Sequence, residues 1–180
     1  MTRLGAILAG GRSSRFGADK GVALLAGTPL IDHVVEALRY QCDDMVIAGR
    51  EWPGLLSIDD RPAPDQGPLG GLCAALHYAR QRGHDEVVCA GCDTLPVPSD
   101  LAVRLSPGPA VVEGHWLLGL WPSLLAEELD AWLAGQPDRA IRAWMRRTRV
   151  RTVPLPGRLF NINTPEALAE AEARLINGQS

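Results

Sequence analysis

The feature that most constrains this chain is a short apolar run near its start that ends in two glycines. Residues 3–8 have the length and composition of one buried strand, and Gly10 and Gly11 close the apolar run behind it. The loop beyond them carries three cations: Arg12, Arg15 and Lys20. Because glycine has no Cβ, backbone N–H groups at these positions can approach a ligand closely. The segment therefore predicts a site for an anionic ligand, first of all a nucleotide polyphosphate.

Two common phosphate-binding motifs do not match this loop. A dinucleotide fingerprint needs Gly-x-Gly-x-x-Gly at the start of a helix, and the Gly-Gly-Arg of residues 10–12 departs from it. A Walker-type loop places Gly-Lys-Ser/Thr together, whereas Lys20 stands three residues after Gly17 and is followed by Gly21. The loop is therefore a third kind of phosphate-binding loop, and a glycine-rich surface turn with solvated charges is the alternative.

The composition is that of one ordinary globular domain. The chain has 180 residues, of which 46% are hydrophobic and 22% charged, so we expect a single domain over residues 1–180. A formal net charge of −3 provides no basic field for bulk nucleic-acid binding. The sequence shows no run of about 18 apolar residues and no signal-peptide pattern, so we expect a cytoplasmic protein that does not enter a membrane.

The four cysteines are too few to form a disulfide framework in a chain of this length. Cys89 and Cys92 form a C-x-x-C pair. A zinc site would need a second Cys or His pair, and a thioredoxin-like motif would open a helix, whereas this one ends an apolar strand. Redox or zinc chemistry of this pair is therefore the less favoured interpretation. Cys42 and Cys73 lie on apolar helix faces and are expected to be small core residues.

Apolar patterns predict strands that alternate with helices. Strands are predicted at residues 3–8, 45–48, 55–58, 87–90 and 149–154, with a hairpin of residues 110–113 and 116–121 turned at Gly114. Helices are predicted to begin at Thr28 as N-cap, to run from the Gly67–Gly71 segment to Gly83, and to cover residues 99–105, 122–133, 140–147 and 165–176. This alternation indicates an α/β fold: a Rossmann-like, mostly parallel sheet flanked by helices on both faces.

Three polar segments follow the carboxyl ends of predicted strands, where ligands bind in such sheets. They are the glycine loop, the loop around Asp60 and the turn at Asp93. Asp93 comes directly after an apolar strand and precedes Thr94 and a proline, a position suited to Mg²⁺ bound together with substrate phosphates. The alternative is an aspartate whose side chain caps its own turn.

Two further segments combine capping with binding. Gly67–Gly71 starts a helix whose N-terminal N–H groups favour anions or base edges, with capping by Asp65 as the alternative. Near the end of the chain, Asn163 or Thr164 caps the last helix, which has a proline in its first turn. Asn161 and Asn163 also offer uncharged oxygen atoms to a metal or to an acceptor substrate.

Several of these motifs resemble one family. The Leu-Ala-Gly-Gly of residues 8–11, continued to Lys20, resembles the signature loop of the nucleotidyltransferase superfamily and is most similar to that of the molybdenum cofactor guanylyltransferases (MobA-type). Residues 92–96 resemble the metal-aspartate motif of the same enzymes, and residues 161–166 resemble their Asn-x-Asn-Thr-Pro-Glu motif. The matched motifs span residues 4–168, which is almost the whole chain.

The resemblance implies a nucleotide-diphospho-sugar transferase-like fold and transfer of GMP from GTP to the phosphate of molybdopterin, with release of pyrophosphate. It implies that Lys20 and Arg15 stabilise the phosphates and that Asp93 holds Mg²⁺. The residues it assigns to binding are Leu8, Ala9, Gly10, Gly11, Lys20, Asp60, Gly70, Asp93, Asn161 and Asn163. The product would pass to cofactor-inserting or cofactor-accepting molybdoenzyme proteins, and we expect a monomer or weak oligomer.

One position departs from the family's pattern. Relatives often carry an asparagine just after the second strand, and here that stretch is Ile47-Ala48-Gly49-Arg50. Either backbone groups or Arg50 substitute for the asparagine, or recognition of the base differs. The choice of guanine is therefore less constrained than the chemistry, and a sibling enzyme that uses CTP, or acts on a sugar phosphate or an alcohol, is the nearer alternative. A nucleotide-binding regulator without catalysis is the second alternative. It would be expected to lose Lys20 or Asp93 first, and both are present.

A stretch rich in arginine lies outside these motifs. Arg139, Arg142 and Arg146 are spaced three and four apart on one predicted helix face. Four more arginines follow them: Arg147, Arg149, Arg151 and Arg158. In a chain of net negative charge this is a local basic patch, and we hypothesise that some of these arginines bind the anionic pterin substrate. The alternative is a solvated helix face.

Overall fold

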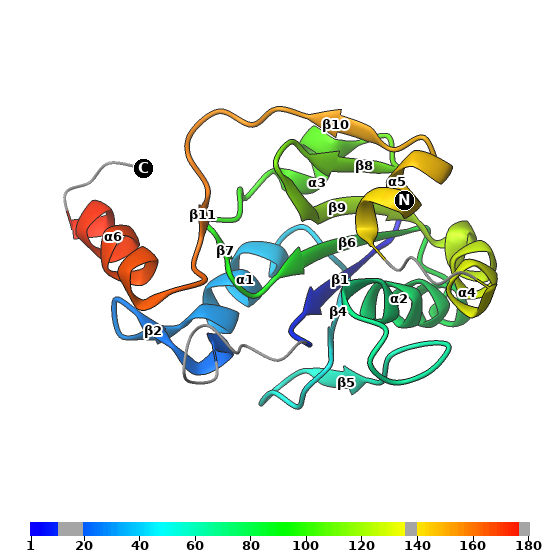
Figure 1. Ribbon diagram of the computed structural model, residues 1–180, viewed down its shortest axis with the longest axis horizontal. Coiled ribbons are helices and arrows are strands. Elements are labelled where there is room, and N and C mark those ends of the chain that lie inside the picture. The colour runs from blue at the N-terminus through cyan, green and yellow to red at the C-terminus, as the bar shows by residue number, and fades with distance from the viewer. Residues whose placement is uncertain (11–19, 136–139, 177–180) are drawn as a thin grey trace.

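The computed structural model describes residues 1–10, 20–135 and 140–176, and its centre is a seven-stranded sheet (Figure 1). The strand order is β10-β8-β9-β6-β1-β4-β5, and neighbours are parallel except where β9 pairs with β6 and β8. The strands are β1 (Arg3–Leu8), β4 (Asp44–Ala48), β5 (Leu56–Ile58), β6 (Glu86–Gly91), β8 (Ala110–Val112), β9 (His115–Pro122) and β10 (Arg151–Val153). The mostly parallel α/β sheet predicted from the sequence is confirmed.

Helices and two short strand pairs complete the described chain. The α-helices are α1 (Leu30–Arg39), α2 (Pro68–Arg82), α3 (Leu101–Leu105), α4 (Ala126–Gly135), α5 (Ile141–Arg147) and α6 (Pro165–Ile176), and the 3₁₀ turns are η1 (Lys20–Val22) and η2 (Ser123–Leu125). The short antiparallel pairs are β2 (Leu24–Leu25) with β3 (Thr28–Pro29), and β7 (Thr94–Leu95) with β11 (Phe160–Asn161). No helix in these ranges is both long and apolar enough to span a membrane.

The sheet has a separate apolar core on each face, because successive side chains of a strand point to opposite sides. On β1, Leu4 and Leu8 belong to the core that also contains the buried side chains of α2, α4 and α5. Ile7 belongs to the other core, with the buried side chains of α1, α3 and α6. Figure 1 shows α2 and α4 side by side on one face of the sheet. Helices therefore flank both faces, as predicted.

The predicted helix start at Thr28 is wrong. Thr28 pairs with Leu25 in a two-stranded hairpin, and the helix begins only at Leu30, after Pro29. The two residues at the hairpin turn, Ala26 and Gly27, both have positive φ (51° and 80°), which is the backbone geometry of a tight hairpin turn. Alanine rarely adopts positive φ, so the sequence pattern gave no signal for this turn.

Glycine is required where β1 and β4 end side by side. The Ala9 N–H donates to the Ala48 carbonyl (3.0 Å), which carries the pairing one residue beyond the strands. The next residue, Gly49, has φ +89°, and a Cβ there would lie 2.6 Å from the backbone nitrogen of Gly10. The backbones of Gly10 and Gly49 are therefore in direct contact.

We expect Gly49→Ala to destabilise the protein more than the same change at Gly54. Gly54 also has positive φ (+78°), but a Cβ there would meet nothing within 4 Å. Gly54→Ala should therefore cost only the left-handed backbone strain of about 1–2 kcal/mol, whereas Gly49→Ala must also displace the backbone of Gly10. Urea unfolding of both variants measures the difference, and equal losses would contradict the contact.

Candidate active site

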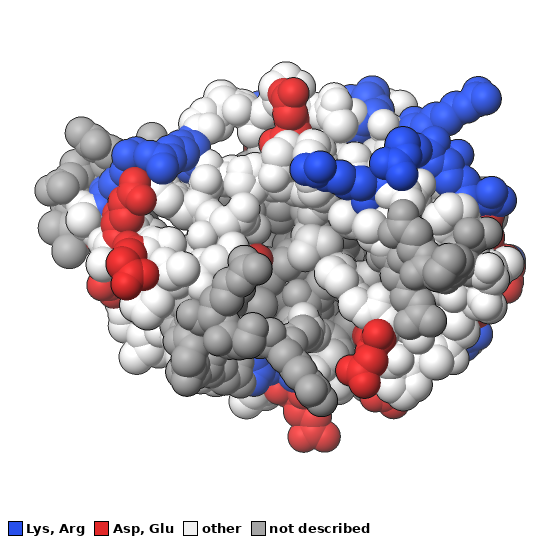
Figure 2. All heavy atoms as spheres, viewed as in Figure 1, with Lys and Arg blue, Asp and Glu red and all other residues white. Residues whose placement is uncertain are grey.

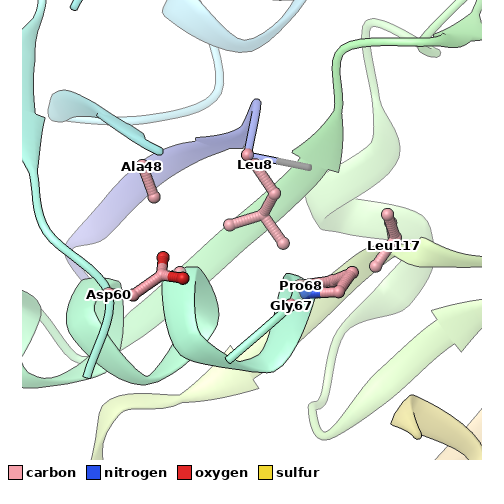
Figure 3. A pocket seen from close by; sticks show the side chains of 8 residues that line it. Leu8, Ala48, Asp60, Gly67, Pro68 and Leu117 are labelled. Carbon is pink, nitrogen blue, oxygen red and sulfur yellow. The ribbon is translucent and has the colours of Figure 1, made fainter. Parts of the chain in front are cut away.

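The carboxyl ends of β1, β4 and β6 meet at one edge of the sheet, and a small hollow lies there (Figure 3). It is lined by Leu8, Gly10, Ala48, Asp60, Gly67, Pro68, Gly71 and Leu117. Its volume of about 30 Å³ is much smaller than a nucleotide, so it is the floor of a site rather than a complete site. Leu117 was not predicted as a lining residue, because the sequence does not show that β9 returns beside β6.

Asp60 is held in this hollow by the first turn of α2. Figure 3 shows its carboxylate directed into the space bounded by Leu8, Ala48 and Pro68. A Cβ on Gly70 would lie 2.9 Å from Asp60 Oδ2, so only glycine at position 70 allows the helix to come this close. The structure thus brings together Asp60 and Gly70, which the family resemblance had assigned to nucleotide binding.

The start of α2 has no side-chain cap. Its N-cap is Gly67 (φ +65°), and no side chain there accepts a capping hydrogen bond, so the alternative role of Asp65 as the cap is wrong. Asp65 has positive φ (58°) and lies in the turn before the helix. Uncapped N–H groups at a helix start favour a negatively charged or hydrogen-bond-accepting ligand.

The environment of Asp60 raises the pKa of its carboxyl group above the ordinary value. Burial is the largest cause, the negative charges of Asp65 and Asp59 act in the same direction, and the backbone N–H of Gln66 opposes them. A carboxylate in this position gains most from a ligand that donates hydrogen bonds to it. Asp60 is therefore suited to contact N–H groups of a bound base.

Because the pKa of Asp60 is raised in the folded state, its protonated carboxyl group stabilises the folded protein relative to the unfolded chain. This stabilisation is lost as the pH rises through the folded-state pKa. Asp60→Asn removes the cost of burying the charge. We expect the melting temperature of this variant, relative to the parent, to increase between about pH 4 and about pH 7. The exposed neighbour variant, Asp59→Asn, is the control. A difference that does not change with pH would contradict the raised pKa.

A second group of polar side chains lies at the end of β6. Thr94 Oγ1 donates to Asn161 Oδ1 (2.8 Å), and the Ile162 N–H donates to the Asp93 carbonyl (2.7 Å). The pairing of β7 with β11 holds these segments together although they are 67 residues apart in sequence. The structure therefore brings Asp93 and Asn161 to one place.

The last helix is capped as predicted. The Ala167 N–H donates to Thr164 Oγ1 (3.2 Å), and Pro165 is the first residue of α6. The Asn163 N–H donates to the Asn161 carbonyl (2.9 Å), which shapes the turn between β11 and the helix. Thr164 therefore has the capping role, and the two asparagines are placed by the turn that precedes it.

Three side chains at this turn offer oxygen atoms as metal ligands, beside the thiol of Cys92. Asp93 contributes a carboxylate, Thr94 a hydroxyl and Asn161 an amide oxygen. Mg²⁺ prefers oxygen ligands and is commonly held by one or two carboxylates together with substrate phosphates. The chemistry of this donor set therefore fits Mg²⁺.

The glycine loop is described only at its two ends. Gly11 and Arg15 lie outside the described residues, and of Lys20 the structure describes the backbone, at the start of η1. The Ala9 N–H is occupied by the Ala48 carbonyl, so of the backbone groups of Ala9 the carbonyl is the one available to contact a base.

The C-x-x-C pair shows no sign of a reactive thiolate at Cys89. That residue is buried in β6, its Sγ donates to the Leu117 carbonyl (3.3 Å), and burial raises the pKa of its thiol to about 12. Cys92 is half-buried in the turn beyond the strand. Cys89 is therefore a protonated, buried core residue.

Three of the predicted arginines surround a second hollow, of about 340 Å³. It is lined by Trp116, Arg142, Met145, Arg146, Arg149 and Val150. The Arg142 guanidinium lies over the Trp116 ring, 5.5 Å from its centroid. Figure 2 shows arginine side chains gathered over α5 and β10 on this side of the molecule.

The other described arginines of the patch are bound elsewhere. Arg147 pairs with Glu128 (3.0 Å), Arg158 pairs with Glu170 (3.2 Å), and Arg151 donates to the carbonyls of Leu105 and Pro107. Arg139 lies outside the described residues. The patch predicted from sequence is therefore narrowed to Arg142, Arg146 and Arg149, which share the hollow with Trp116.

The fold and the converging polar loops define a nucleotidyltransferase-like α/β domain, and comparison with known proteins gives the family. The chain belongs to the family described as the MobA-like NTP transferase domain, whose model matches residues 5–153. It is 38% identical to the molybdenum cofactor guanylyltransferase of Cereibacter sphaeroides, over 97% of this chain and 98% of that protein. The enzyme of the same name from Rhizobium meliloti is 37% identical, over 94% and 90%.

Solved structures share the fold. The molybdopterin-guanine dinucleotide biosynthesis protein A of Archaeoglobus fulgidus matches with a TM-score of 0.74 at 24% identity, over 97% of this chain and 99% of that one. CMP:2-keto-3-deoxy-manno-octonic acid synthetase, in complex with CTP, matches with a TM-score of 0.73 at 14% identity, over 99% and 100%. The expected nucleotidyltransferase fold is therefore confirmed over nearly the whole chain.

Proposed function

We propose that this protein transfers GMP from GTP to the phosphate of molybdopterin, forming molybdopterin guanine dinucleotide. An acceptor phosphate oxygen bonds to the α-phosphorus of GTP, the bond from that phosphorus to the bridging oxygen breaks, and pyrophosphate leaves. The observation that carries the proposal is the convergence of the Asp60 hollow and the Asp93–Asn161 turn at the sheet edge where β1 ends. The high identity to enzymes named guanylyltransferases supports GTP as the nucleotide.

The chemistry asks this chain mainly to align two anions. The acceptor phosphate is already a nucleophilic oxyanion, so no strong general base is needed, and catalysis rests on positioning and charge stabilisation. Lys20 and Arg15 are proposed to offset the charge of the reacting and departing phosphates. Asp93, Thr94 and Asn161 would hold Mg²⁺, which when bound offsets negative charge on phosphate oxygens.

The Asp60 hollow is proposed to receive the base. Asp60 accepts hydrogen bonds from donor groups on the base edge, and the uncapped start of α2 donates to acceptor groups. Guanine offers both kinds of group on one edge. No observation in the described part of the chain favours CTP, a sugar-phosphate acceptor or a non-catalytic role.

A pyrophosphate-release assay with each of the four nucleoside triphosphates, with and without molybdopterin, tests the function. We expect release only with GTP and acceptor together.

Lys20→Ala should lower turnover about a hundredfold or more, because one preorganised charge is lost. Asp93→Asn should abolish activity at low Mg²⁺ because the metal ligand loses its charge. If either variant turned over at the parental rate, the proposed role of that residue in the site would be contradicted.

The Trp116 hollow is proposed to receive the pterin. Trp116, which lines this hollow, and Leu117, which lines the Asp60 hollow, are consecutive residues of β9. An indole and guanidinium planes suit a flat heterocycle, and the arginines suit its phosphate. The arrangement would hold the acceptor next to the nucleotide.

We therefore expect Arg142→Ala and Arg146→Ala to raise the KM for molybdopterin several-fold and to leave that for GTP nearly unchanged. Arg82→Ala is a matched control, because its guanidinium lies 5.4 Å from the Tyr78 ring centroid, in the same kind of contact as Arg142. Unchanged acceptor kinetics at both low and high salt would show that the patch is only solvated surface.

A further inference from the structure

A cysteine, a histidine and an aspartate meet where α2 packs against α4. Cys73 and His77 are four residues apart and therefore lie on one face of α2. Asp130 belongs to α4. One ligand atom from each residue lies within 4.8 Å of the other two, and none of the three belongs to either hollow described above.

These three side chains are shielded from water. Cys73 is fully buried, and the side chains of His77 and Asp130 are 12% and 19% exposed. His77 Nε2 lies 3.0 Å from Asp130 Oδ2, yet this buried nitrogen makes no hydrogen bond of acceptable geometry. A buried polar nitrogen without an aligned partner is costly, and a bound cation would satisfy it.

An arginine supplies positive charge to the cluster in this structure. Arg61 Nη2 lies 2.8 Å from Asp130 Oδ2, and the Arg61 side chain is 46% exposed. Because it reaches the cluster from a loop and is half in solvent, it can leave without disturbing either helix. The carboxylate of Asp130 therefore has a replaceable counter-ion.

We propose that Cys73, His77 and Asp130 form a site for a thiolate-binding divalent metal of the Zn²⁺ type, and that Arg61 leaves Asp130 when the metal enters. Sulfur, imidazole and carboxylate ligands together suit Zn²⁺ and do not suit Mg²⁺. Three protein ligands leave one of four tetrahedral positions for water. The site is independent of the proposed nucleotidyl transfer and of the oxygen ligands at Asp93.

Metal entry requires a small contraction and the loss of one proton. Ligand atoms around tetrahedral zinc lie about 3.3–3.8 Å apart, whereas those of the cluster lie within 4.8 Å of one another, so metal entry requires side-chain rotations that bring the more distant atoms closer. The metal–sulfur bond replaces the S–H bond of Cys73, and the proton goes to solvent.

Sequence spacing alone does not reveal this site. A C-x-x-x-H pair on a helix is only half of a metal site, and the third ligand comes from a helix more than fifty residues further along the chain. The prediction that Cys73 is a small buried residue is confirmed. Its position opposite Asp130 follows only from the packing of α2 against α4.

The test is titration of the full-length, reduced protein with Co²⁺, a spectroscopic probe for zinc sites. We expect a thiolate-to-cobalt charge-transfer band in the near ultraviolet that saturates at one equivalent and is removed by Zn²⁺. Cys73→Ser should abolish the band. His77→Gln and Asp130→Asn should weaken Co²⁺ binding at least tenfold, and both keep the proposal testable if the Cys73 variant fails to fold.

Three matched variants show whether Co²⁺ binds at this cluster or elsewhere on the chain. Arg61→Gln should strengthen Co²⁺ binding, because it removes the competing cation. His84→Gln should leave binding unchanged, since the His84–Asp44 pair (3.0 Å) has the same histidine–carboxylate geometry but belongs to no such cluster among the described residues. Cys92→Ser should also leave it unchanged. The proposal is overturned by a missing band in the parent protein, by a band that survives Cys73→Ser, or by weaker binding in Arg61→Gln.

Discussion

The structure depends on the parallel pairing of β1 with β4 and β6, because this pairing fixes where all the polar loops begin. The hydrogen bond from Ala9 to Ala48 carries the pairing past the end of β1, and the contact between Gly10 and Gly49 lets both chains turn away at the same level. The Asp60 hollow lies directly beside that turn. A side chain at position 49 would separate the two loops, so the shape of the candidate site depends on direct contact between the backbones of Gly10 and Gly49.

The sequence predicted the sheet and most helices because its apolar periods are regular, and it predicted that the loops would converge because parallel strands end at one edge. It could not predict the hairpin at Ala26, whose positive φ is unusual for alanine. It also could not show that Leu117 and Trp116 line neighbouring hollows, because that depends on where β9 returns in space. Local sequence patterns carry no information on which segments pair when they are far apart in the chain.

Acidic and basic side chains are distributed differently around the Asp60 hollow and the Trp116 hollow. The Asp60 carboxylate lines one hollow, where burial first and then the negative charges of Asp65 and Asp59 raise its pKa. Arginines surround the Trp116 hollow, while their neighbours Arg147 and Arg158 are occupied by glutamates. A modest net charge therefore conceals two hollows that differ in charge, one lined by a carboxylate and the other by three arginines.

The pairing of β11 with β7 has a consequence for the order in which the molecule is completed during synthesis. All seven strands of the central sheet lie before residue 154, whereas Asn161, the hydrogen-bond partner of Thr94 beside Asp93, comes later in the chain. A nascent chain can therefore close its sheet while this corner is still open. The ribosome must release residues 160–163 before they can join it, so the corner beside Asp93 is completed only after the strands that it borders have been synthesised.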